Sequence, residues 1–216
     1  MLTYEESFWK TAPTPVIAGV DEAGRGSLAG PVVAAAVFMR ANTARALYAD
    51  ELAGLTDSKK LTPERRELFF EIMTRREDVY TAAGWCTAKE VDTLNVLCAT
   101  HLAMRRALGA LPTAVDHALI DGLPVKNLPC SSTAIVKGDF KSFLIAAASI
   151  IAKVTRDHHM VAMEDVYPGY GFAAHKGYGT HEHITALHKF GACAIHRHSF
   201  RPVQDVEQGL PGFEWQ

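Results

Sequence analysis

The sequence predicts an α/β layered domain in which helices cover a mixed β-sheet. Several short apolar runs have strand character, and segments with helical periodicity alternate with the later ones. A short glycine-rich connection joins the first two runs, which favours antiparallel neighbours. Three of the runs end in or beside a carboxylate, so we expect the chemistry of this chain where these strands end.

The predicted strands combine apolar composition with turn residues at their ends. Their expected ranges are 16–21, 32–38, 79–86, 118–122 and 133–136. Helices are expected over 64–76, 88–108, 141–164 and 181–190. Thr62 followed by Pro63 is a typical helix start, with an N-cap and a proline at the first helical position. Thr87 and Glu90 have the spacing of a capping box, which marks the start of another helix.

The chain is expected to form one domain over residues 16–196, with a small helical appendage towards its C-terminal end. Residues 1–15 are polar, contain Pro13 and Pro15, and are predicted to be a loose lead-in. The tail over 197–216 contains Pro202 and Pro211 and is predicted to be irregular. No repeat or low-complexity segment interrupts this order, so a single core is expected.

Composition limits the classes of protein to consider. The chain has 216 residues, 48% of them hydrophobic, with a formal net charge of −2, which argues against a nonspecific nucleic-acid coat protein. It does not exclude an enzyme that binds nucleic acid through a local patch. The longest apolar run, 143–152, is too short to span a bilayer, and the first residues lack the pattern of a signal peptide. Cys86, Cys98, Cys130 and Cys193 form no C-x-x-C pair, so reduced thiols in a cytoplasmic protein are expected.

The stretch over 19–26 is the most informative one. Asp21 and Glu22 come directly after an apolar run, and the turn Gly24-Arg25-Gly26 follows them closely. Buried carboxylates are costly unless they bind a cation or a donor, and glycine lets backbone approach a ligand closely. A dinucleotide fingerprint is the alternative, but it needs a helix after the glycines, whereas residues 31–38 resemble a strand. A plain hairpin with a charged tip would leave the acidic pair unexplained.

Carboxylates at the strand ends suggest a metal centre. Asp121 and Asp139 lie at or just after two later strands, so they can meet Asp21 and Glu22 at one edge of the sheet. Close carboxylates repel, and divalent cations relieve the repulsion; an oxygen-only ligand set favours Mg²⁺ or Mn²⁺ over zinc. The alternative is that the glycines beside Asp121 and Asp139 only mark turns. Asp157 competes for the fourth place, but about five helical turns separate it from Asp139, so pairing with Lys153 or Arg156 is expected for it.

These motifs together resemble those of bacterial ribonuclease HII, the type 2 ribonuclease H family. The matching stretches cover 19–37, 57–61, 120–122, 136–139, 147–157, 176–180 and 196–200. The resemblance implies a ribonuclease H-like fold and an endonuclease that cuts RNA in RNA–DNA hybrids. It also implies cleavage on the 5′ side of single ribonucleotides in duplex DNA, leaving a 3′-hydroxyl and a 5′-phosphate, and hence a role in removing ribonucleotides from DNA. A monomer that binds such duplexes, uses two Mn²⁺ or Mg²⁺ ions and binds no membrane is expected.

The resemblance also assigns roles to individual residues. The metal-binding, catalytic acids of the family fall on Asp21, Glu22, Asp121 and Asp139. Its backbone-contacting motif, which senses the 2′-hydroxyl, falls on Gly24, Arg25 and Gly26, and its junction-sensing tyrosine falls on Tyr178. A 2′-hydroxyl is the group by which a protein tells RNA from DNA. Lys59 precedes a predicted helix and is a candidate phosphate contact, although a solvated surface charge is the simpler interpretation.

The sequence departs from the family pattern at three positions. Ser27 replaces a common proline, Leu123 an asparagine and His198 an arginine. None of these changes removes a catalytic group, but they leave substrate affinity and metal preference open. The main functional alternative is a non-catalytic nucleic-acid binding module of the same fold, and a junction-cutting DNA nuclease is a weaker one.

Histidines crowd the C-terminal part of the chain. His181, His183 and His188 allow a structural zinc site as one interpretation, but their helical spacing does not place all three on one face. Surface histidines, with one of them near the scissile phosphate, are therefore the favoured prediction.

Overall fold

The computed structural model describes residues 1–11 and 14–209. In that part of the chain, five strands form one mixed sheet with the order β3-β2-β1-β4-β5. β1 (Ile17–Ala23) pairs antiparallel with β2 (Val32–Met39), which pairs antiparallel with β3 (Val79–Cys86). On its other side β1 pairs parallel with β4 (His117–Asp121), and β4 pairs parallel with β5 (Ser131–Ile135). The predicted α/β class and the antiparallel first pair are confirmed, and a strand after the glycine turn excludes the dinucleotide fingerprint.

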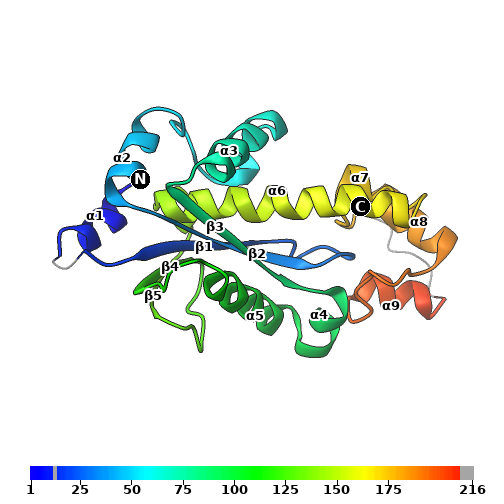
Figure 1. Cartoon of the computed structure of the whole chain (residues 1–216). Coiled ribbons are helices and arrows are strands. Elements are labelled where there is room, and N and C mark those ends of the chain that lie inside the picture. Colours follow the sequence, from blue (N-terminus) through cyan, green and yellow to red (C-terminus); the bar gives the residue numbers. More distant parts are fainter. Residues whose placement is uncertain (12–13, 210–216) are drawn as a thin grey trace.

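Helices cover both faces of the sheet (Figure 1). The long helix α6 (Phe143–Val166) and α3 (Pro63–Arg75) lie on one face, and α5 (Val96–Gly109) lies on the other. Every residue of β2 is buried, as expected for a strand with a core on each side. Gly19 lets α6 approach β1 closely, because a Cβ at this position would collide with the main chain of Leu144.

The N-terminal segment is not the loose lead-in that the sequence predicted. Residues of α1 (Thr3–Trp9) pack onto the domain, and Trp9 is buried. The carboxylate of Glu5 is fully buried and accepts hydrogen bonds from the Ser142 hydroxyl (2.6 Å) and the Leu144 amide (3.0 Å) at the start of α6. This contact across the fold attaches the N-terminus to the central helix, which the local polar composition did not indicate.

Several helix predictions need correction. The single helix predicted over 88–108 is two helices, α4 (Ala88–Leu94) and α5, because Asn95 adopts φ 66° and its side chain caps the Cys98 amide. The helix α2 (Ala41–Ala49) was not predicted, since no side-chain cap marks its start. Two short 3-10 helices, η1 (Ser58–Lys60) and η2 (Gly138–Phe140), were also missed.

A group of short helices lies near the C-terminal end of α6 (Figure 1). It contains α7 (Phe172–His175), α8 (His181–Phe190) and α9 (Arg201–Glu207). The helical appendage is therefore present, and α9 corrects the prediction of an irregular tail; residues 210–216 of that tail lie outside the described residues. Thr180 caps α8 and Gly191 ends it, as predicted.

All four cysteines are free thiols, in agreement with the prediction. Among the helices of residues 1–11 and 14–209, none combines the length and apolarity needed to cross a membrane.

Candidate active site

The sheet brings the predicted acidic residues together at one edge. β1, β4 and β5 are parallel, so their C-terminal ends meet there. Val20 pairs with Ile120, and the next residues along these strands are Asp21 and Asp121. Asp139 lies in η2, directly after β5, and the Asp121 carboxylate accepts a hydrogen bond from the Gly138 amide (2.6 Å). Positions more than a hundred residues apart in the sequence therefore share one site.

Burial and mutual repulsion raise the pKa values of three of these acids. Asp21 is 6% exposed, and its pKa lies well above the ordinary value, first because of burial and then because of Glu22, Asp121 and Asp139. Burial also raises the pKa of Glu22, although Arg25 opposes this effect. The pKa of Asp139 rises to about 6, through burial and then the charges of Asp121 and Asp57. Folding thus holds carboxylates together at an energetic cost, which is typical of functional sites.

The donor set suits a hard divalent cation, because all four side chains offer oxygen and their repulsion is relieved by positive charge. In the present conformation, no group of three or more histidine, cysteine, aspartate or glutamate side chains in the described residues is arranged to hold an ion. Glu22 instead forms an ion pair with Arg25 (3.0 Å), and Asp21 accepts a hydrogen bond from the Glu22 amide (2.6 Å). Binding an ion would require these side chains to turn.

The Gly24-Arg25-Gly26 turn follows the first two acids directly, and a buried arginine side chain supports it from the protein interior. Gly24 has φ 88°, and a Cβ there would collide with the guanidinium of Arg156. The buried Arg197 donates hydrogen bonds to the carbonyls of Gly24 (2.7 Å) and Arg25 (2.8 Å). The Arg25 side chain and Gly26 face solvent, so the outer side of the turn is open to a ligand. Ser27, where the family pattern has proline, is buried, and its hydroxyl has no hydrogen-bond partner.

Lys59 and Tyr178, the two remaining candidate site residues, lie on different segments of the chain. Lys59 is exposed on η1. Its positive charge opposes the rise in the pKa values of Glu22 and Asp139, so the Lys59 side chain lies near both carboxylates. Tyr178 lies between α7 and α8, and the ammonium of Lys153 lies 5.4 Å from its ring centre.

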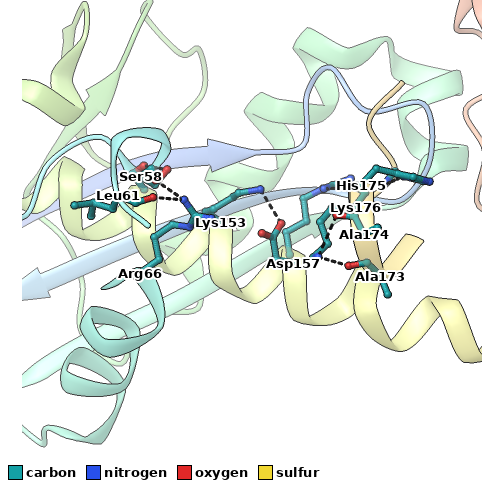
Figure 2. Close-up of polar contacts among 12 residues, drawn as sticks. Ser58, Leu61, Arg66, Lys153, Asp157, Ala173, Ala174, His175 and Lys176 are labelled. Atoms are coloured by element: carbon teal, nitrogen blue, oxygen red, sulfur yellow. Dashed lines mark hydrogen bonds and ion pairs between the residues drawn. The ribbon is translucent and has the colours of Figure 1, made fainter. Parts of the chain in front are cut away.

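A groove of about 390 Å³ runs past Tyr178 between α3, α6 and α7. Figure 2 shows Arg66 on α3, the Lys153–Asp157 pair on α6 and Lys176 after α7, all of which line this groove. The Lys153–Asp157 distance of 2.9 Å confirms the pairing predicted for Asp157.

His183 and His196 are both buried, which for His183 corrects the prediction of a surface histidine. His183 donates through Nδ1 to the Tyr178 carbonyl (2.9 Å), so its Nε2 must accept, and His196 Nε2 donates to it (3.0 Å). His196 Nδ1 in turn accepts from the Cys193 amide (2.9 Å). In this arrangement each ring donates a hydrogen bond through one nitrogen and accepts one through the other, which requires both imidazoles to be neutral. Burial lowers the pKa of each ring to about 4, consistent with that state.

Sequence reasoning also missed two buried arginines, Arg156 and Arg197, each with an exposed fraction of 0%. Their hydrogen-bond acceptors are main-chain carbonyls far away in the sequence, so no local pattern marks them. The order His196-Arg197-His198-Ser199-Phe200 within the family resemblance was the only available signal for Arg197.

The mixed sheet with its acidic edge defines a protein of the ribonuclease H-like fold. Comparison with known proteins agrees: the crystal structure of the ribonuclease H2 from Pyrococcus horikoshii OT3 superposes with a TM-score of 0.71, covering 90% of this chain and 98% of that one at 27% identity. Bst-RNase HIII in complex with Mn²⁺ shares the fold (TM-score 0.69, 16% identity, 96% of this chain and 81% of that one).

The sequence comparisons then identify the family. The Ribonuclease HII family model matches residues 18–203. The ribonuclease HII of Moorella thermoacetica is 51% identical over 185 residues, which is 86% of either chain. The chain belongs to the ribonuclease HII family and is a ribonuclease H endonuclease.

Proposed function

We propose that this enzyme cuts the RNA strand of RNA–DNA hybrids and the 5′ side of single ribonucleotides in duplex DNA. The products would be a 3′-hydroxyl and a 5′-phosphate, and the enzyme would act as a monomer in ribonucleotide removal. The observation that carries the proposal is the meeting of Asp21, Glu22, Asp121 and Asp139 at one sheet edge, where burial and repulsion raise the pKa values of three of them.

The four carboxylates would hold two divalent ions, Mn²⁺ or Mg²⁺. One structural relative was crystallised with Mn²⁺, which supports this choice of chemistry. A bound pair of such ions supplies an activated water molecule and stabilisation of the leaving oxygen of a phosphodiester. Glu22 would exchange its ion pair with Arg25 for the metal, so that Arg25 becomes available to a phosphate.

Other residues would select the scissile bond. The open side of the Gly24-Arg25-Gly26 turn would bind the backbone beside the 2′-hydroxyl, since Gly26 is exposed there and has no Cβ to block its main chain. Tyr178 would pack against the deoxyribose that follows the ribonucleotide, where a 2′-hydroxyl is disfavoured. Lys59, close to Glu22 and Asp139, would contact a phosphate and balance the acidic charge.

A matched pair of variants tests the catalytic assignment. Asp21→Asn keeps the side-chain shape but removes a charge from the acidic edge, whereas Asp157→Asn removes a charge outside it. Cleavage of an end-labelled RNA–DNA hybrid is measured with Mg²⁺ and with Mn²⁺. We expect Asp21→Asn to lose at least about a thousandfold in kcat, and Asp157→Asn to stay within about threefold of wild type. Full activity of folded Asp21→Asn would contradict the assignment; tight binding by wild type without cleavage under either metal would favour the non-catalytic module.

A further inference from the structure

Beside the site lies a buried arginine side chain, Arg156, to which the proposed function assigns no role. Arg156 lies on α6 and is fully buried. In the described part of the chain, each of its hydrogen bonds goes to a main-chain carbonyl: Pro31 (2.9 Å), Ala29 (3.1 Å) and Lys176 (2.9 Å). A buried charge without an ion pair is costly, so a residue of this kind needs a specific reason to be present.

The carbonyls that Arg156 binds belong to two different segments. Ala29 and Pro31 end the loop that begins with the Gly24-Arg25-Gly26 turn, while Lys176 precedes Tyr178. The guanidinium also lies 5.3 Å from the centre of the Tyr178 ring. One side chain therefore contacts both of the segments to which we assign recognition of the ribonucleotide and of the following deoxyribose.

The two segments also touch directly and leave little room for movement. The amides of Leu28 (2.8 Å) and Ala29 (3.3 Å) both donate to the Gly177 carbonyl. A Cβ at Gly177 would come within 2.5 Å of the Ala29 carbonyl oxygen. Convergent carbonyl oxygens repel one another, and a planar fork of five donors is well suited to hold them at a fixed separation; a lysine ammonium is a point charge and lacks this geometry.

The other buried arginine provides a contrast. Arg197 donates to the carbonyls of Gly24 (2.7 Å), Arg25 (2.8 Å) and Gly30 (2.9 Å), all within the first segment. The structure gives it no hydrogen bond to the Lys176–Tyr178 segment among the described residues. In its hydrogen bonds Arg197 thus supports the first segment alone, whereas Arg156 bonds to both segments.

We propose that Arg156 is a positioning residue that fixes the distance between the Gly24-Arg25-Gly26 turn and Tyr178, and so determines selectivity for a ribonucleotide–DNA junction. This inference rests on the proposed function. A single ribonucleotide in DNA uses both contacts at once, because its 2′-hydroxyl meets the turn while the next deoxyribose meets the ring. A uniform RNA–DNA hybrid presents a 2′-hydroxyl at the ring position, so its cleavage depends less on their spacing.

The test compares kcat/KM for a duplex with one ribonucleotide and for an RNA–DNA hybrid, in wild type, Arg156→Lys and Arg197→Lys. We expect Arg156→Lys to lower the ratio of the two values by at least about tenfold, the effect of losing one charge-assisted hydrogen bond. Arg197→Lys should lower both values and leave the ratio within about twofold. Rates are corrected for the folded fraction, measured by circular dichroism, because a purely structural defect would change both substrates equally.

Each outcome supports or overturns the inference. An unchanged ratio in folded Arg156→Lys, or an equal shift in Arg197→Lys, would overturn it while leaving the proposed function intact. A wild type that cuts neither substrate would overturn the proposed function and the inference together. Arg156→Gln, which avoids a buried ammonium, is the second variant if Arg156→Lys does not fold. If neither folds, Arg156 is required for folding and the positioning role is withdrawn.

Discussion

Replacing Asp139 by asparagine should abolish cleavage and stabilise the protein in the absence of metal. The folded state raises the pKa of Asp139 from 3.8 to about 6, through burial and then the charges of Asp121 and Asp57. The folded protein therefore binds this proton more tightly than the unfolded chain. Wild type should lose stability as the pH rises from about 4 to about 6, and the loss should remain in full above pH 6. The asparagine variant has no such titration.

The size of the effect follows from the pKa difference. A rise of roughly two units corresponds to about 3 kcal/mol, and because Asp139 is only partly buried, solvent screening reduces this to about 1.5 kcal/mol. For a chain of this length, that free energy raises the melting temperature by about 3–6 °C. The variant should thus gain stability while it loses activity, as expected where a functional site is held together at a cost.

The assay is thermal unfolding in EDTA between pH 4 and pH 8, with Asp157→Asn as the matched control. Asp157 forms an ion pair with Lys153, so its replacement should leave stability unchanged or lower it by up to about 1 kcal/mol. The advantage of Asp139→Asn over wild type should grow between pH 4 and pH 6 and then level off. A variant no more stable than wild type at pH 8, or an advantage independent of pH, would refute the electrostatic reasoning.

Other predictions test the surrounding structure. Because His183 and His196 are held neutral with pKa values of about 4, wild type should lose up to about 3 kcal/mol relative to His196→Gln as the pH falls from 6.5 to 4; parallel unfolding curves would contradict this. Ser27→Ala removes a buried hydroxyl without a partner, so the free energy of unfolding should stay constant or rise by up to about 1 kcal/mol in urea titrations; a clear loss would show an overlooked partner. Gly19→Ala should lower the free energy of unfolding by about 3 kcal/mol or more, because its Cβ would collide with α6, whereas Gly26→Ala meets no atom within 4 Å and should unfold like wild type; equal stabilities would contradict the packing.

The sheet and the position of the acids could be predicted because their signals are local. Apolar runs bounded by turn residues indicated all five strands of the described chain. Because β1 pairs parallel with β4, Asp21 and Asp121 lie next to each other at the ends of these strands. The caps at Thr62 and Thr87 were also found where they were predicted, since a capping side chain bonds to a residue three positions away.

The remaining features depend on contacts that local sequence does not encode. Glu5 looks like a solvated charge, but it is buried against the start of α6, far away in the sequence. Arg156 was considered only as a partner for Asp157, and His183 was expected on the surface. Their buried positions were missed for a similar reason, because their partners are main-chain carbonyls that only the folded chain supplies. Asn95 breaks a helix by adopting a positive φ, which asparagine tolerates but does not require.

The measurement that tests the central claim most directly uses end-labelled duplex DNA carrying one ribonucleotide, with an all-DNA duplex of the same sequence as control. Wild-type enzyme is incubated with each duplex in Mg²⁺, Mn²⁺ or EDTA, and the ends of the products are mapped. We predict one metal-dependent cut on the 5′ side of the ribonucleotide, leaving a 3′-hydroxyl and a 5′-phosphate, with the all-DNA duplex intact. Cleavage in EDTA, cleavage of the all-DNA duplex, or a cut at another position would contradict the account.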